Sequence, residues 1–147
     1  QSEELGVDDR NEGRGVTCFD FDKDGDIDIL TANNSGPYRL FRNNISDNVG
    51  STNSLGINLI SSTQNVYGIG SKISLEINDV TMTREMNSSG NYLSTNPLQV
   101  HFGMGSYVRA DRLIINWPYG TKTQILGVKS NQIMTISDDV IVSGGFE

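Results

Sequence analysis

The segment DFDKDGDIDIL, residues 20–30, carries an aspartate at every second position from Asp20 to Asp28. Carboxylates this close together repel one another, at about 1 kcal/mol for each like-charged pair ~4 Å apart in water. The spacing is that of a D-x-D-x-D-G-x-x-D loop, in which alternate side chains turn inward and Gly25 permits a sharp turn. A calcium ion takes about six to eight oxygen ligands, so it would remove the repulsion. The segment therefore predicts a calcium site.

The predicted metal site consists of the five aspartates of this loop: Asp20, Asp22, Asp24, Asp26 and Asp28. All but Asp26 are side-chain candidates, because the seventh position of such loops usually binds through its backbone carbonyl. Magnesium is disfavoured because it demands a stricter octahedron and keeps its waters. The alternative is a solvated acidic turn that needs no metal, and the apolar residues on both flanks argue against it.

The loop is predicted to lie between two β-strands rather than two helices. Its twelfth position is Thr31 instead of glutamate, and both flanks, 16–20 and 27–32, alternate as strands do. Calcium loops of extracellular modules bind at ~10⁻⁴–10⁻³ M. A tenfold excess over such a constant stabilises a fold by roughly 1.4 kcal/mol, so the site is expected to act as a structural clip.

The rest of the chain also favours strands, because β-branched residues are common and the only alanines are Ala32 and Ala110. Residues 72–77 alternate cleanly, and Asn78-Asp79 predicts a hairpin turn to residues 80–84. Further strands are expected at 38–42, from 57, and at 97–102, 111–117, 123–126 and 132–136. We predict an all-β fold, in which one calcium-loop β-hairpin unit is followed by an antiparallel β-sandwich or barrel.

Composition and charge restrict the partners. The net charge of −7 falls within residues 1–30, which hold ten acidic and three basic residues, so nucleic acid is not an expected partner. Cys18 is the only cysteine, which excludes an internal disulfide, and we expect a buried, inert thiol. The chain contains no run of about 18 apolar residues, so we predict no membrane span. We find no signal-peptide pattern, and the polar start is consistent with a fragment of a longer protein.

Two parts of the chain resemble known families. Residues 13–44, RGVTCFDFDKDGDIDILTANNSGPYRLFRNN from Arg14 onward, resemble an FG-GAP/VCBS-type repeat, one blade of a β-propeller. YGIGSKISLEI (67–77), TREMNSSGNYLSTNPLQVHFGMG (83–105), ADRLIINWPYG (110–120) and NQIMTI (131–136) resemble the ASPIC/UnbV domain, which follows such repeats. The resemblance implies a secreted, periplasmic or cell-surface protein with upstream propeller blades in the same chain, and it implies no established chemistry.

These observations predict four parts. Residues 1–12 are expected to be a flexible N-terminal segment, and residues 13–50 a partial propeller blade with the calcium loop. Residues 54–138 are expected to form the ASPIC/UnbV-like β-domain, and residues 139–147 a tail. The polar stretch 43–55 is expected to connect the two folded parts.

Three functions compete. The leading hypothesis is a non-enzymatic calcium-binding module for adhesion or scaffolding, whose partner is another extracellular protein or a glycan. The second is a carbohydrate-binding accessory module, with Trp117, Tyr119 and Tyr92 as candidate platforms, although Trp117 is first expected to cap the core. The third is an enzyme that uses the aspartates hydrolytically. His101, the only histidine, is expected to be structural, and the serine-rich turns carry no nucleophile motif.

Overall fold

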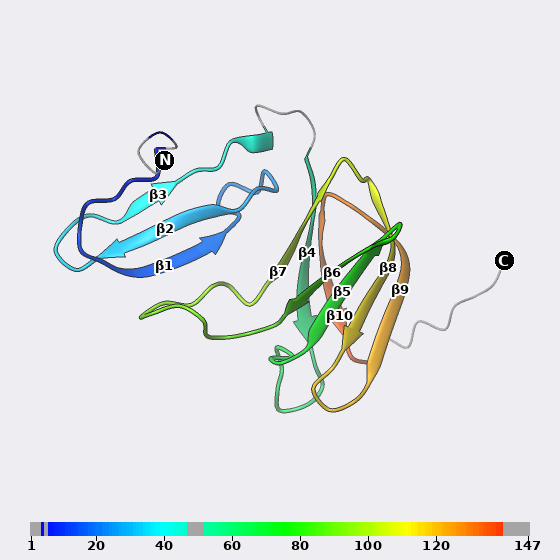
Figure 1. The fold of residues 1–147 in the computed structure, drawn as a ribbon. Helices are drawn as coiled ribbons and strands as arrows, with labels where there is room; N and C mark the ends of the chain where they lie inside the picture. The colour runs from blue at the N-terminus through cyan, green and yellow to red at the C-terminus, as the bar shows by residue number, and fades with distance from the viewer. Residues whose placement is uncertain (1–3, 5, 47–51, 140–147) are drawn as a thin grey trace. The chain divides into compact units, whose positions relative to one another are not determined.

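The computed structural model describes residues 4, 6–46 and 52–139, and in these residues the fold is all-β. Figure 1 shows the ten strands of this part of the chain. Their bounds are β1 Gly13–Phe19, β2 Asp28–Asn33, β3 Arg39–Phe41, β4 Asn53–Ile60, β5 Lys72–Ile77, β6 Val80–Glu85, β7 Val100–Gly105, β8 Arg109–Asn116, β9 Lys122–Lys129 and β10 Gln132–Ser137. The predicted tail, apart from Asp139, lies outside the described residues.

The chain divides into two compact units. The first comprises Gln1–Gly50 and Ser88–Pro97, and the second comprises Ser51–Asn87 and Leu98–Glu147. The segment Ser88–Pro97 therefore packs with the first unit, although its position in the sequence led us to include it in the second domain. Its side-chain hydrogen bonds, described below, explain this difference.

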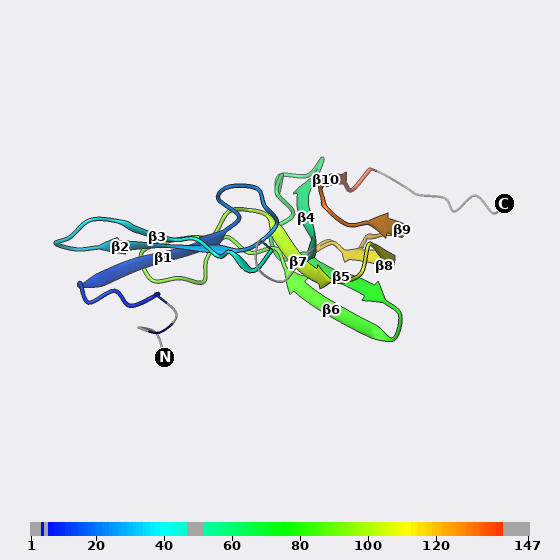
Figure 2. The ribbon, with the colours of Figure 1, turned by 90° about the horizontal axis from the view of Figure 1, so that it is seen from above.

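The first unit contains one antiparallel sheet in the order β1-β2-β3. Cys18 pairs with Ile29, which in turn pairs with Phe41 in β3. Figures 1 and 2 both show these three strands side by side. The three strands expected here are confirmed with small shifts at their ends. Cys18 is half-buried rather than buried, because β1 lies at the edge of the sheet.

The segment Ser88–Pro97 covers the outer edge of β1 with polar side chains. Ser94 Oγ accepts a hydrogen bond from the Val16 N–H at 3.0 Å and donates one to the Val16 carbonyl at 2.6 Å. Asn96 Oδ1 accepts from the Cys18 N–H at 3.0 Å. An edge strand exposes unpaired backbone groups to any other chain, and these contacts satisfy them.

The second unit contains two open sheets. One has the order β10-β4-β7 and the other the order β6-β5-β8-β9. All pairs are antiparallel except β4 and β10, in which Ile57 pairs with Met134 in a parallel ladder. The sequence did not predict this parallel pair, because β4 and β10 begin and end the unit and no short hairpin turn fixes their direction. Neither sheet closes into a barrel within the described residues.

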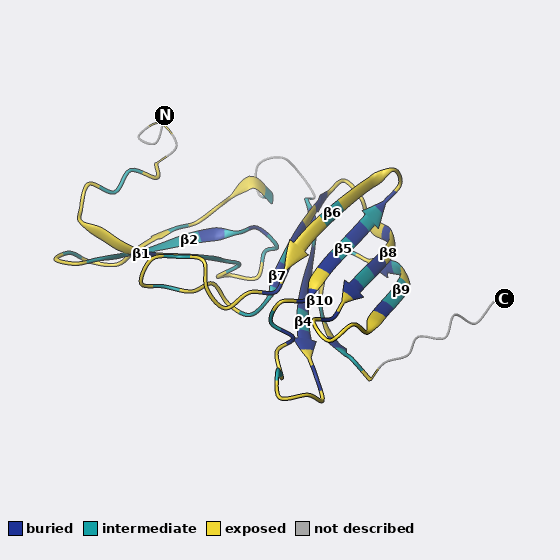
Figure 3. Cartoon of the chain, turned by 60° about the horizontal axis from the view of Figure 1, so that its bottom comes forward, coloured by how far each residue is buried: buried dark blue, intermediate teal, exposed yellow. Residues whose placement is uncertain are grey.

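Both sheets of the second unit contribute to one apolar core, which is coloured dark blue in Figure 3. The alternation predicted for residues 72–77 is confirmed, since Ile73, Leu75 and Ile77 are all buried in β5. The predicted hairpin at Asn78-Asp79 is also confirmed, because Ile77 pairs directly with Val80 of β6. The buried apolar set is Leu55, Ile57, Leu59, Ile73, Leu75, Ile77, Met86, Val100, Phe102, Met104, Ala110, Leu113, Ile115, Trp117, Val128 and Ile136.

One boundary of the expected connection at residues 43–55 is wrong. Residues 47–51 lie outside the described part of the chain, but Asn53–Leu55 already belong to β4. Asn53 and Leu55 are both buried. The polar composition of this stretch hid the strand, because Asn53 is buried through hydrogen bonds to the Gly105 carbonyl and from Asn131 rather than through apolar contact. No helix in the described residues combines the length and the apolar character that crossing a membrane requires.

Candidate metal centre

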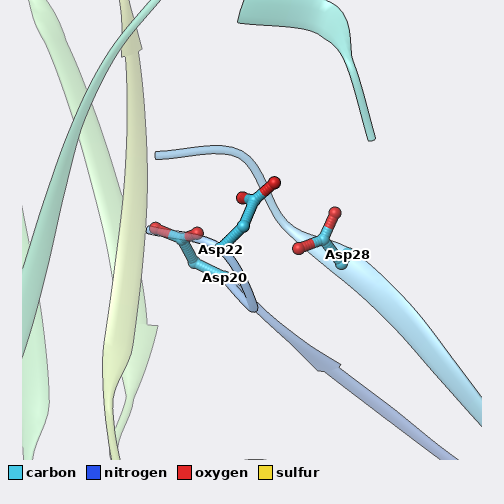
Figure 4. Close-up of side chains that lie close together, drawn as sticks. All are labelled: Asp20, Asp22 and Asp28. Atoms are coloured by element: carbon cyan, nitrogen blue, oxygen red, sulfur yellow. The ribbon is translucent and has the colours of Figure 1, made fainter. Parts of the chain in front are cut away.

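The aspartate loop connects β1 to β2, and it brings three carboxylates together. Asp20, Asp22 and Asp28 each offer one oxygen, and these oxygens all lie within 4.8 Å of one another. Figure 4 shows Asp20 and Asp22 on the loop after β1 and Asp28 at the start of β2. The antiparallel pairing of Phe19 with Asp28 holds the two ends of the loop together. The alternating spacing in the sequence thus becomes a cluster of acidic oxygens.

Asp28 is the buried member of the cluster, with no exposed surface. Its Oδ2 accepts a hydrogen bond from the Phe21 N–H at 2.9 Å, and its Oδ1 accepts from the Asn43 N–H at 2.7 Å. A carboxylate has about four lone-pair sites, so two remain for another partner. Asp28 therefore ties the loop to the chain that follows β3 while keeping acceptor capacity.

Asp20 carries the least satisfied oxygen of the loop. Its Oδ2 accepts from the Gly25 N–H at 3.0 Å. Its Oδ1 is buried and has no hydrogen-bond partner. A buried acceptor without a partner is costly, and a carboxylate oxygen is costlier than a neutral one. This oxygen is what a bound cation would satisfy.

Asp24 and Asp26 lie outside this cluster of three. Asp24 Oδ1 accepts from the Asp26 N–H at 2.9 Å, and this bond, followed by the Arg42 guanidinium, lowers the pKa of Asp24 below its ordinary value. The carboxylate of Asp26 is buried and accepts from the Ser46 N–H at 2.7 Å. Its side chain is thus engaged outside the cluster, as expected for a position that binds through its backbone.

Arg42 is a partner of the loop that the sequence analysis missed. Its Nε pairs with Asp22 Oδ2, and its Nη2 lies 3.1 Å from Asp24 Oδ2. The guanidinium therefore offsets part of the repulsion between the aspartates. The only indication in the sequence was the position of this arginine directly after β3, the strand that pairs with β2.

The backbone of the loop makes the sharp turn that was predicted at Gly25, whose φ is +94°. Lys23 also has a positive φ of 64°, a region that costs a side-chain-bearing residue about 1–3 kcal/mol. A contact elsewhere must hold Lys23 in this region. The two hydrogen bonds that Asp20 and Asp24 accept from the N–H groups of Gly25 and Asp26 supply it.

The residues fit a hard cation. Asp20, Asp22 and Asp28 would hold it through carboxylate oxygens, and one of these oxygens is buried without a partner. Calcium prefers such oxygens and tolerates irregular geometry. The ion would supply positive charge that neutralises the loop, and hence structural stability.

The aromatic platforms proposed from the sequence divide into buried and exposed side chains. Trp117 is buried, its Nε1 donates to Thr123 Oγ1 at 2.9 Å, and its ring stacks on Tyr119. The expectation that Trp117 caps the core is confirmed, and Trp117 is not accessible as a sugar platform. Tyr92, by contrast, is 73% exposed.

A second polar cluster was not found from the sequence. Ser61 Oγ lies 2.9 Å from the Tyr119 hydroxyl and donates to Asp138 Oδ2 at 2.5 Å, and Tyr119 also donates to Asp138. The hydrogen bond from Ser61, followed by that from Tyr119, lowers the pKa of Asp138 to about 2. So acidic a carboxyl is a poor proton acceptor near neutral pH, and the cluster instead ties the end of β4 to the end of β10.

The family follows from the second unit. The family model described as ASPIC and UnbV matches residues 61–141. The chain belongs to the ASPIC and UnbV family. This confirms the resemblance that the motifs of residues 67–136 predicted, and the matched segment begins at Ser61 and includes Asp138 of the polar cluster. The FG-GAP/VCBS resemblance of residues 13–44 stays a prediction, and no curated protein matches the chain.

Proposed function

We propose that this ASPIC/UnbV protein is a non-enzymatic, calcium-binding β-module of a secreted, periplasmic or cell-surface protein. Its role would be adhesion or scaffolding, with another extracellular protein or a glycan as the partner. The observation that carries the calcium proposal is the convergence of Asp20, Asp22 and Asp28, together with the buried, unpartnered Oδ1 of Asp20.

The role of calcium would be structural. Asp20 and Asp28 already accept hydrogen bonds from the backbone of Gly25, Phe21 and Asn43, so an ion bound to them would reinforce the link between β1, β2 and the chain after β3. A carboxylate that binds such an ion is not free to serve as an acid or a base. This supports a binding role over hydrolytic use of the aspartates.

The finer architecture belongs to the same proposal. The β1-β2-β3 meander, with its metal loop after the first strand, supports a propeller-blade-like repeat of the FG-GAP/VCBS type over residues 13–50. The shared core of the two open sheets supports a β-sandwich over residues 54–138. The blade would then join upstream blades of the same chain, because a propeller needs several.

Calorimetric titration with calcium tests the function. We expect binding at ~10⁻⁴–10⁻³ M, the range of extracellular calcium modules. Asp20→Asn should weaken it at least tenfold, because it removes charge from the oxygen that lacks a partner. Asp79→Asn, an exposed acid in the β5–β6 turn, is the matched control and should bind as the parent does. Equal binding by all three proteins, or none by any, would overturn the proposal.

A further inference from the structure

The first unit contains an open cavity of about 410 Å³ that is separate from the aspartate loop. Its walls come from the segment before β1, from the start of β1, from Thr31 of β2 and from Tyr92. The volume lies within the ~300–1,000 Å³ range of small-ligand sites. None of the five loop aspartates lines it.

One wall of the cavity is an irregular strand. Gly13 pairs with Asn33 and Gly15 with Ala32, so the ladder shifts at Arg14 between them. Bulges of this kind re-aim side chains and are frequent next to binding sites. Glycine at position 15 allows a close approach, because a Cβ here would meet Ser94 Cβ at a tight 3.3 Å. Arg14 and the two glycines beside it, Gly13 and Gly15, all line the cavity.

The lining also includes the aromatic ring of Tyr92, which lies on a constrained turn. Tyr92 precedes Leu93, whose φ of +52° is unusual for a large side chain, and both side chains are 73% exposed. A bridge between Asn91 and Ser94 closes this turn. Ser94 Oγ and Asn91 Nδ2 both bond to Val16, which also lines the cavity. These bonds therefore constrain the turn whose backbone carries the exposed Tyr92 ring, and strain of this kind concentrates at functional sites.

Three polar residues of the lining, Asp9, Asn11 and Thr31, are hydrogen-bonded to one another. Asp9 Oδ2 accepts hydrogen bonds from Asn33 Nδ2 at 2.8 Å and from Thr31 Oγ1 at 3.0 Å, and its Oδ1 accepts from Asn11 Nδ2 at 2.6 Å. These bonds, that from Asn33 first, lower the pKa of Asp9 to about 2, so it is an anion at neutral pH. This part of the lining is thus formed before any ligand arrives.

The chemistry of the walls selects the ligand. The exposed ring of Tyr92 suits the C–H face of a ring-shaped ligand. Thr31 Oγ1 and Asn11 Oδ1 can accept hydrogen bonds from ligand hydroxyl groups, since their donors are already bonded to Asp9, and the guanidinium of Arg14 can donate to such groups. A phosphate or nucleotide is disfavoured, because the arginines at this end of the sheet already have acidic partners: Arg14 lies 3.8 Å from Glu12, and Arg39 lies 3.4 Å from Asp9. A lipid chain is disfavoured because the polar and charged groups of Asp9, Asn11 and Arg14 line the cavity.

From this arrangement we infer that the cavity between the Arg14 bulge and Tyr92 binds a neutral pyranose sugar, stacked on the Tyr92 ring. The inference does not depend on calcium at the aspartate loop. It assigns the glycan contact to the first unit and to one of the three aromatic residues considered from the sequence.

Saturation-transfer NMR with the whole chain tests this site. The probes are the methyl pyranosides of glucose, galactose, mannose and N-acetylglucosamine at about 10 mM, because one sugar in an open site binds in the millimolar range. Methyl glucuronide is the anionic comparison. At least one neutral sugar should bind, more tightly than the glucuronide, and with the same affinity in calcium and in EDTA.

Variants at two equally exposed tyrosines provide the control. Tyr92→Ala should weaken binding about tenfold, the loss expected for one aromatic contact, while Tyr92→Phe keeps the ring and should stay within about threefold. Tyr38→Ala removes a ring that is 75% exposed and lies outside the cavity, so it should bind as the parent does. Absence of binding by every sugar, or equal loss in Tyr92→Ala and Tyr38→Ala, would overturn the inference.

Discussion

Each of the two units is stabilised internally by a different kind of residue. Among the described residues, all sixteen buried apolar side chains belong to the second unit, where they form one core. In the described part of the first unit, the buried side chains are the carboxylates of Asp26 and Asp28, and Asp9 joins Asn11, Thr31 and Asn33. Apolar burial organises one unit and hydrogen-bonded aspartates organise the other. The second unit should therefore be indifferent to cations, and the first should depend on them.

The largest expected effect is a cavity in the second unit. Leu113→Ala on β8 empties a fully buried site and should lower the free energy of unfolding by about 2–5 kcal/mol in urea denaturation. Leu126→Ala on β9 is the matched control, since Leu126 is 62% exposed and should change it by less than about 0.5 kcal/mol. Equal effects of the two substitutions would contradict the assignment of the core.

The next effect should be confined to the first unit. Asp28→Ala removes the acceptor for two part-buried N–H groups, those of Phe21 and Asn43, and a fully buried donor left unpaired costs about 1–3 kcal/mol, which is the upper bound for each. In NMR spectra we expect the amide signals of the first unit to lose dispersion while those of the second keep theirs. Simultaneous loss in both would show that the units do not differ as described.

A pH effect should appear in the second unit at Asp138. Hydrogen bonds from Ser61 and Tyr119 lower its pKa from the ordinary 3.8 to about 2. A lowered pKa stabilises the fold above the ordinary value, and this contribution is lost as the pH falls toward about 2. The melting temperature of the second unit should fall over this range.

Asp138→Asn should lower that melting temperature at pH 6 and make it less dependent on pH between about 4 and 2. Asp139→Asn, at the next position, is the control and should leave the pH dependence of the parent in place. The same slope in Asp138→Asn and in the parent would remove Asp138 from the acid response.

The smallest effect concerns the turn at Leu93. Leu93→Gly should stabilise the first unit by about 1 kcal/mol or less, because glycine adopts φ of +52° without strain but adds freedom to the unfolded chain. Leu126→Gly, within β9, should instead destabilise the second unit by about 0.5–1 kcal/mol. Hydrogen exchange of each unit measures both changes, and a loss of stability in Leu93→Gly would show that this turn is not strained.

The sequence was most informative where local pattern decides structure. The alternation of residues 72–77 and the turn at Asn78-Asp79 predicted β5, β6 and their pairing. The D-x-D-x-D-G spacing predicted that alternate carboxylates turn inward, and three of the four side-chain candidates, Asp20, Asp22 and Asp28, lie close together. It also predicted the sharp turn at Gly25, whose φ is positive. These features depend on neighbouring residues, so a short stretch of sequence contains them.

Contacts between distant segments could not be predicted, because they leave no local pattern in the sequence. The parallel pairing of β4 with β10 depends on the whole unit between them. Ser94 and Asn96 read as turn residues, yet their side chains cover the edge of β1, nearly eighty positions earlier. Arg42 is likewise an ordinary arginine until the sheet brings it to Asp22 and Asp24. Polar side chains bond to whatever the fold places beside them, and their spacing does not reveal the partner.

We propose that calcium binds the aspartate loop and orders the first unit alone. A calcium titration followed by amide NMR signals tests it most directly, with about 10 mM as the upper concentration for a site of this class. We predict that calcium shifts the amide signals of residues 20–28 and of Asn43, whose N–H donates to Asp28. The signals of the second unit should stay unchanged, and Asp20→Ala should abolish the shifts. Unmoved loop signals at that concentration, or shifts that persist in Asp20→Ala, would contradict the claim.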